Sequence, residues 1–269
     1  MVKSLRARCV RLRFRVGAGV ALLAGLAPTA AVAQWAPMDT ARPALWVVND
    51  ADTTIYLFGT IHTHDGRARW FDHAIRRAFD AAGELVLETL IPPVGAKLET
   101  SPGSGLSAAK ATIQSARTIG LSVELGADQV LNRAALAVGM PVFGLEDFSD
   151  QLRMYQSLPT PARPAVPAAA ASQRLPDPRL APFLRQMVDR WNQGDAGPIE
   201  AVVAGVRSQS PDAYRRLFSD RNMAWALWIG KRLERPGTVF VAVGTGHLVG
   251  SDSVQVRLAA AGIRSARIN

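Results

Sequence analysis

Cysteine is almost absent from this chain of 269 residues. The one cysteine, Cys9, lies in a basic N-terminal segment, so the rest of the chain has no disulfide, no zinc–cysteine site and no catalytic thiol. Exported domains depend on disulfides when they are too small to build a sufficient core. A chain of this length is large enough to bury a core without them.

Long apolar runs are also missing. Residues 16–27 form an apolar stretch of twelve, whereas a transmembrane helix needs about 20. This stretch follows six basic residues and precedes Ala31-Val32-Ala33, a small-x-small cleavage pattern. The pattern predicts an export signal over residues 1–33 and a mature chain of residues 34–269. We therefore expect a periplasmic or secreted protein without a stable membrane anchor after signal cleavage.

Excess charge of either sign is small once the signal is set aside. Six of the 31 Lys and Arg residues lie in it and none of the 22 acids does, so the net charge falls from +9 to +3. A nucleic-acid-binding surface requires clustered basic residues. We expect no nucleic-acid partner, and the composition leaves the oligomeric state open.

Short apolar segments alternate with amphipathic ones along the mature chain. This alternation predicts one α/β domain with a mainly parallel central sheet flanked by helices. A hairpin is predicted at 45–58, further strands at 84–88, 141–146, 238–243 and 263–269, and helices at 71–82, 106–121, 127–139, 147–158, 180–195, 199–206, 211–235 and 254–262. The Pro- and Ala-rich residues 159–178 indicate a linker or an extended surface loop between two helices.

Histidine is scarce, yet two of the four histidines end the same tetrapeptide. His62 ends Gly-Thr-Ile-His at 59–62, and His247 ends Gly-Thr-Gly-His at 244–247. Each tetrapeptide follows an apolar segment that is predicted to be a strand. The glycine permits a sharp turn and a close approach to a ligand. We expect the threonine hydroxyl to bond locally and fix that turn, and the histidine to point into the crevice beyond the strand.

Two glutamates end two other predicted strands. Glu88 closes residues 84–88, and Glu146 closes residues 141–146. Because ligands bind beyond the carboxyl ends of parallel strands, neighbouring strands would bring both imidazoles and both carboxylates together. Such a set suits a divalent cation such as Zn, Mn, Co or Fe, with positions left for water. An open metal site acidifies bound water and polarises a carbonyl, which is hydrolytic chemistry.

Each of these residues also has a structural interpretation. A histidine at a strand end is more often structural than catalytic, and either glutamate can begin the next helix. His64 and Asp65 fit an exposed loop, and His73 lies on a helix near solvent, where we expect no role. The four strand ends taken together are a stronger signal than any single member.

The helix at 211–235 adds a second group. Its segment Arg-Asn-Met-Ala-Trp places Arg221 beside Asn222 and one turn from Trp225. An arginine and an asparagine can orient a carboxylate or stabilise an oxyanion. The spacing alone favours a simpler alternative, a solvated arginine beside a core tryptophan.

The paired Gly-x-x-His motifs with an intervening glutamate resemble the TraB/GumN family, which includes the TIKI proteases that act on Wnt proteins. The resemblance extends from ALWVVNDADTTIYLFGTIH through ELVLE, ADQVLNRAALAVGMPVFGLEDFSDQL, RWNQGD and RNMAWA to VFVAVGTGHLVG and LAAAGI. Residues 92–121 and 159–178 depart from it. Substrate-contacting elements can lie in either segment, so the resemblance does not carry a substrate over.

The resemblance implies an α/β fold related to erythromycin-esterase-like and haem-binding iron-uptake proteins. TIKI-type members are described as divalent-metal-dependent peptidases that use the two Gly-x-x-His histidines and a glutamate. By this resemblance His62, His247 and Glu88 are the expected metal ligands, with Mn, Co or Zn as the ion. Three further residues match family positions and complete the expected site: Glu146, Arg221 and Asn222.

Two kinds of function follow from these expectations. The first is an exported metal-dependent hydrolase that acts on a peptide or protein, with one glutamate as ligand and the other as general base. The second is a periplasmic binding protein for haem, a metal or a small ligand, which an apolar pocket would favour. A role in polysaccharide export or assembly is a third alternative that only the family association suggests.

Overall fold

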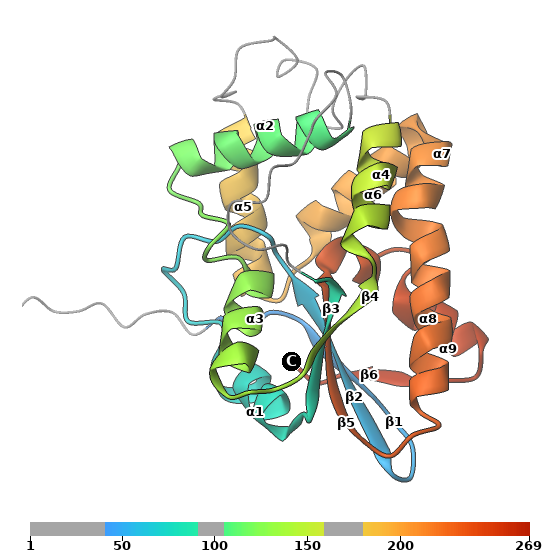
Figure 1. Cartoon of the computed structure of the whole chain (residues 1–269). Coiled ribbons are helices and arrows are strands. Elements are labelled where there is room, and N and C mark those ends of the chain that lie inside the picture. The colour runs from blue at the N-terminus through green and yellow to red at the C-terminus, as the bar shows by residue number, and fades with distance from the viewer. Residues whose placement is uncertain (1–40, 91–104, 159–179) are drawn as a thin grey trace, which may run out of the picture. The chain divides into compact units, whose positions relative to one another are not determined.

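A six-stranded sheet forms the centre of the protein in a computed structural model (Figure 1). The structure describes residues 41–90, 105–158 and 180–269. The strands lie in the order β4-β3-β5-β2-β1-β6. Their bounds are β1 Leu45–Asn49, β2 Thr53–Thr60, β3 Glu84–Thr89, β4 Val142–Glu146, β5 Gly237–Gly244 and β6 Ser265–Arg267. The predicted signal at 1–33 and the Pro- and Ala-rich segment at 159–178 lie outside the described residues.

The sheet is mixed, with a parallel part of four strands, as predicted, and an antiparallel part at one edge. Strands β4, β3, β5 and β2 are parallel neighbours, whereas β1 pairs antiparallel with β2 and β6 pairs antiparallel with β1. The antiparallel pairing of β1 with β2 follows from the predicted hairpin, because so short a connection cannot join parallel strands. The carboxylate of Asp50 holds the hairpin turn by accepting from the backbone N–H groups of Asp52 and Thr53.

Helices cover both faces of this sheet. Helices α1, α3 and α5 contribute to the apolar core on one face, and α8 and α9 contribute to the core on the other (Figure 1). The helix bounds are α1 His73–Ala81, α2 Gly105–Thr118, α3 Ala127–Ala137, α4 Phe148–Ser157, α5 Leu180–Asn192, α6 Gly197–Gln209, α7 Pro211–Tyr214, α8 Asp220–Arg232 and α9 Val254–Ala260. Within the described ranges, no helix is long and apolar enough to cross a membrane.

Successive strand residues supply the two cores. Phe58 packs in the core that contains α1, and its neighbour Leu57 packs in the core that contains α8. On β5, Phe240 likewise packs in the core that contains α1, and Val241 packs in the core that contains α8. Because side chains alternate across a strand, a strand buried on both faces is apolar at every position. Each such side chain stabilises the fold by about 1.5–3 kcal/mol, and the sheet is a rigid base for its carboxyl edge.

The segment predicted as one long helix at 211–235 contains a wider turn. A π-helical turn, Arg215–Ser219, separates α7 from α8. Ser210 stands at the cap position before α7, but its side chain makes no capping hydrogen bond. Extra residues in a π turn shift the faces of the following helix relative to a regular 3.6-residue period. Spacing along the sequence therefore could not tell which residues of α8 face the sheet.

Candidate active site at the carboxyl edge of the sheet

The two Gly-Thr-x-His tetrapeptides lie side by side, because β2 and β5 are adjacent and parallel. Their register pairs Thr60 with Gly244, so the second tetrapeptide is displaced by one residue along the strand. The Thr245 hydroxyl donates to the carbonyl oxygen of Thr60 at 2.8 Å. A Cβ atom at Gly59 would lie 2.9 Å from the Thr245 hydroxyl oxygen, so this crossing requires glycine. The two threonine hydroxyls therefore do not bond locally as expected, because Thr245 donates to the first motif and Thr60 donates to Asp128.

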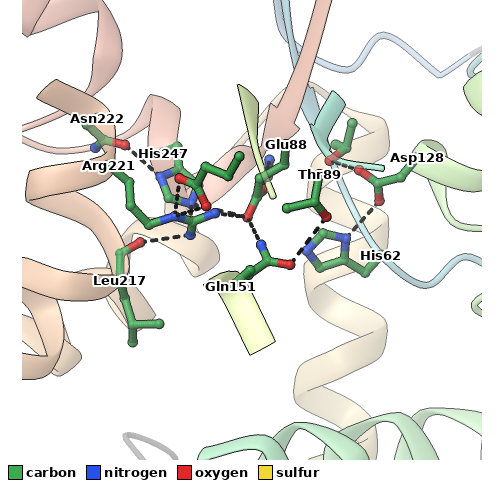
Figure 2. Close-up of polar contacts among 12 residues, drawn as sticks. His62, Glu88, Thr89, Asp128, Gln151, Leu217, Arg221, Asn222 and His247 are labelled. Carbon is green, nitrogen blue, oxygen red and sulfur yellow. Dashed lines mark hydrogen bonds and ion pairs between the residues drawn. The ribbon is translucent and has the colours of Figure 1, made fainter. Parts of the chain in front are cut away.

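His62 is held by a carboxylate that the sequence did not indicate. Its Nδ1 lies 2.7 Å from Oδ2 of Asp128, in the first turn of α3, and Asp128 Oδ1 accepts from the Thr60 hydroxyl at 2.6 Å (Figure 2). The proximity of Asp128 raises the pKa of His62 to about 9. The side chain is 66% exposed. Asp128 therefore fixes the ring through Nδ1 and leaves Nε2 for other partners.

The same strand end brings α3 into position. The backbone N–H of Ala127 donates to the Ile61 carbonyl at 2.8 Å. Gly126 precedes it, and a Cβ atom there would lie 2.3 Å from the carbonyl oxygen of His62. Only glycine permits this approach, which places the first turn of α3 beside His62.

His247 is buried, in contrast to His62. Its Nδ1 lies 2.6 Å from Asn222 Oδ1, and the Asn222 amide nitrogen donates to the Asp252 carbonyl at 2.8 Å. With the amide oriented in this way, Nδ1 carries the hydrogen and Nε2 is an acceptor, 3.2 Å from Arg221 Nη1. The ring lies 4.4 Å from that of Trp225, centroid to centroid. Burial lowers the pKa of His247 to about 3, so the ring is neutral.

Glu88 lies between the two histidines in Figure 2. Its Oε1 accepts from Arg221 Nη2 and, at 2.7 Å, from the Gln151 amide. Its Oε2 accepts from the backbone N–H of Gly244 at 3.2 Å. Burial acts to raise the pKa of Glu88, but Arg221, His247 and His62 together lower it to about 2. Glu88 is therefore a carboxylate at every physiological pH.

Arg221 links the two predicted glutamates. Its Nε donates to both oxygens of Glu146, at 2.8 and 3.1 Å, and its Nη1 donates to the Leu217 carbonyl in the π-helical turn. The guanidinium lies over the Trp225 ring, 4.7 Å from the centroid. Its side chain is 8% exposed, which corrects the alternative of a solvated arginine. Burial acts to lower the pKa of Arg221, but the two carboxylates raise it above its ordinary value.

The three expected metal ligands meet around Gly244. A Cβ atom added there would lie 3.4 Å from Glu88 Oε2, 3.7 Å from His247 Cδ2 and 3.8 Å from His62 Nε2. This glycine has φ −53° and ψ 133°, so its function here is to leave space rather than to adopt a positive φ. Among the described residues, no group of three His, Cys, Asp or Glu side chains is arranged to hold a metal ion as it stands. Arg221 already occupies Nε2 of His247 and Oε1 of Glu88.

A cavity of about 530 Å³ opens beside this cluster. His62, Glu88 and Asp128 line it together with Gln151 and Tyr155. The remaining lining is mainly apolar and comes in large part from α2, α4 and α5. This volume is within the range of small-molecule and substrate sites.

The sequence profile of one protein family matches residues 44–102 and 99–267, which includes both tetrapeptides. The chain belongs to the TraB/PrgY/gumN family. No curated protein matches the chain, and neither does any solved structure. The residues that this TraB/PrgY/gumN protein brings together are therefore interpreted from their geometry.

All six predicted site residues of this TraB/PrgY/gumN chain gather at one sheet edge, but in different positions. His62 and Glu88 line the cavity, whereas His247 is buried behind Glu88. Glu146 lies on the other side of the Arg221 guanidinium, and Asn222 supports His247.

The remaining histidines lie outside this group. His64 is buried, which contradicts its interpretation as an exposed loop residue. Its ring nitrogens lie 3.1 Å from Asn192 Oδ1 and 2.9 Å from the backbone nitrogen of Gly66, so it holds the loop after β2. His73 is exposed at the start of α1.

Sequence reasoning missed several residues of the site in this family member. Asp128, Gln151 and Tyr155 all lie on helices that the sequence predicted, but their roles were not predicted. An acid in the first turn of a helix is common for reasons of the helix dipole, so Asp128 carried no specific signal. Gln151 and Tyr155 are one turn apart, which indicates only a shared helix face.

Proposed function

We propose that this protein is an exported, metal-dependent hydrolase, with a peptide or protein as its substrate. The observation that supports this proposal most directly is the matched support of the two histidines. In each ring Nδ1 is bonded to an oxygen acceptor, Asp128 or Asn222, which directs His62 Nε2 toward Gly244 and leaves His247 Nε2 4.0 Å from Glu88 Oε1. Metal-binding histidines in proteins are oriented in this way by their second ring nitrogen.

The donor set fits a divalent ion such as Mn, Co or Zn in type, and its three members lie around one glycine, Gly244. His62, His247 and Glu88 would hold it, and the ion would supply an acidified water and a polarised carbonyl. Two changes accompany binding. Arg221 would give up its bond to His247 Nε2, and His62, whose raised pKa favours the protonated ring at neutral pH, would release a proton.

The chain's own residues have distinct parts in this proposal. Asp128 and Asn222 hold the imidazoles, and Gln151 fixes Glu88 through its amide. Burial raises the pKa of the Tyr155 phenol to about 12, with Glu88 adding to the effect, so it stays a neutral hydrogen-bond donor lining the cavity. Such a donor can stabilise an oxyanion that forms beside the cluster.

The sequence left open which glutamate is the ligand and which is the general base. The contacts support Glu88 as the ligand, and we propose a part other than general base for Glu146. Glu146 is not among the cavity-lining residues, and both of its oxygens accept from Arg221 Nε. In the proposal Glu146 positions Arg221, and Arg221 in turn holds Glu88.

The experiment that tests the proposal is metal content by elemental mass spectrometry. Residues 34–269 are purified without chelator or affinity-bound metal, and wild type is compared with His62→Ala and His247→Ala. His73→Ala is the control, because His73 is exposed and outside the site. Near-stoichiometric metal in wild type and His73→Ala, lost in both other variants, supports the proposal. A metal-free wild type with no thermal shift on addition of Mn, Co or Zn would sink it.

The cavity favours a second candidate function, a binding protein for an apolar small ligand. The sequence left this alternative open, and an apolar pocket is the feature that it requires. Ligand-dependent thermal stabilisation without turnover would support it. We also propose a fold relation to erythromycin-esterase-like and haem-binding proteins. Export through the segment 1–33 is a separate proposal, which amino-terminal sequencing of the exported chain tests.

A further inference from the structure

Three helices form an apolar wall beside the proposed catalytic cluster. Ala109, Ile113 and Ala116 of α2 line the cavity, and their spacing of four and three residues places them on one helix face. Leu184 and Val188 of α5 line it in the same way, one turn apart. Helix α2 packs against both α4 and α5 in the described part of the chain, so these faces belong to a single enclosure (Figure 1).

Charge is confined to one side of this cavity. The acidic and basic side chains among its described lining residues are His62, Glu88 and Asp128, all from the strand ends and the first turn of α3. The helices α2, α4 and α5 contribute no charged side chain among the residues that line it. A substrate group that enters between these helices therefore meets no counter-charge, and a charged group there would lose hydration without compensation.

We propose that this cavity binds a large apolar side chain, such as leucine or phenylalanine, next to the scissile bond of a peptide substrate. The inference rests on the proposed hydrolase function, because it assumes that the bond cleaved lies at the His62–Glu88 end. The cavity volume of about 530 Å³ accommodates such a side chain together with part of the neighbouring backbone. Burying it fully against the apolar wall improves catalytic efficiency about 10- to 100-fold relative to alanine.

The test measures kcat/KM for octapeptides that differ at one central position. Alanine, leucine, phenylalanine, aspartate and lysine are compared at that position with the metal-loaded protein. The leucine and phenylalanine peptides are expected to exceed the alanine peptide at least tenfold, and the charged peptides to be the poorest. Equal efficiency for all five, or a preference for aspartate or lysine, overturns the inference while the hydrolase proposal stands.

Two cavity variants localise the preference. Ala109→Phe and Thr112→Phe each place a ring in the cavity from α2, and Thr112 is already exposed, so at least one is expected to fold. Each is expected to lower the phenylalanine-to-alanine ratio of kcat/KM at least tenfold. Gln114→Phe is the matched control, because Gln114 is exposed on the same helix and does not line the cavity. An unchanged ratio in a folded cavity variant also overturns the inference.

A binding measurement separates the two proposals if no peptide is cleaved. The phenylalanine and alanine peptides are titrated into wild type by calorimetry. Tighter binding of the phenylalanine peptide without cleavage refutes the hydrolase and retains the apolar cavity as a ligand site. Neither binding nor cleavage refutes both.

Discussion

Replacing Gly244 with alanine should weaken metal binding at the proposed site without lowering the free energy of unfolding. The backbone at Gly244 has φ −53° and ψ 133°, which alanine adopts without strain. The new methyl group would have no heavy atom closer than the 3.4 Å to Glu88 Oε2. Because alanine restricts the unfolded chain more than glycine does, we expect a free energy of unfolding that is unchanged or higher by about 0.4–1 kcal/mol.

The same methyl group occupies the space where the expected ligands converge. It would lie 3.4 Å from Glu88 Oε2 and 3.8 Å from His62 Nε2, whereas an ion requires both donors at about 2.0–2.2 Å and additional room for water. We expect the affinity for Mn, Co or Zn to fall at least tenfold, which corresponds to about 1.4 kcal/mol.

The assay pairs calorimetric metal titration with urea unfolding for wild type, Gly244→Ala and Gly83→Ala. Gly83 is a suitable control because it precedes β3 at the opposite edge of the sheet and a Cβ atom there would be 3.8 Å from its nearest neighbour. Equal metal affinity in wild type and Gly244→Ala, with both proteins folded, would show that the ion is not held around this glycine.

Three further results are expected. Arg221→Leu removes the cation from two carboxylates, so urea titration should show a free energy of unfolding lower by about 3–5 kcal/mol. Arg153→Leu is the control at an exposed ion pair, and it should change this free energy by under about 1 kcal/mol. The free energy of unfolding of the metal-free protein should decline as the pH falls below about 6.5. The folded-state pKa values of His247 (about 3) and Glu88 (about 2) lie below their ordinary values of 6.5 and 4.5, so the unfolded state binds more protons in this range. An unchanged urea midpoint between pH 7 and pH 3 would contradict this prediction. Asp128→Asn should weaken metal binding about 10- to 100-fold with the urea midpoint retained, and a full-affinity variant would remove Asp128 from the site.

The strand ends were predictable because their chemistry is local. An apolar segment followed by Gly-Thr-x-His or ending in Glu places a polar group at a known point of a sheet, and parallel strands share that edge. The order β4-β3-β5-β2 then makes the four ends neighbours. Periodicity alone predicted that these ends would meet only if the strands were neighbours, and the family resemblance supported that they are.

The partners of these residues were not predictable because they depend on packing between distant helices. Asp128 is one acid among many until α3 is placed beside β2, and that placement depends on the contact between Gly126 and the His62 carbonyl. Arg221 looked solvated because arginine is rarely buried unless it is paired, and its two partners, Glu88 and Glu146, come from distant strands. The antiparallel pairing of β6 with β1 was likewise not specified by the sequence, because it joins the last strand of the chain to the first.

The difference in exposure between the two histidines also sets an order of arrival. The His62 side chain is 66% exposed and that of His247 is 6% exposed, behind a guanidinium that bonds to it. In the proposed metal site, an ion entering from solvent would therefore meet His62 first and would reach His247 only after Arg221 had moved away from it. Such a site would fill in two steps, a fast one that depends on ion concentration and a slower one that reports the rearrangement of a single arginine.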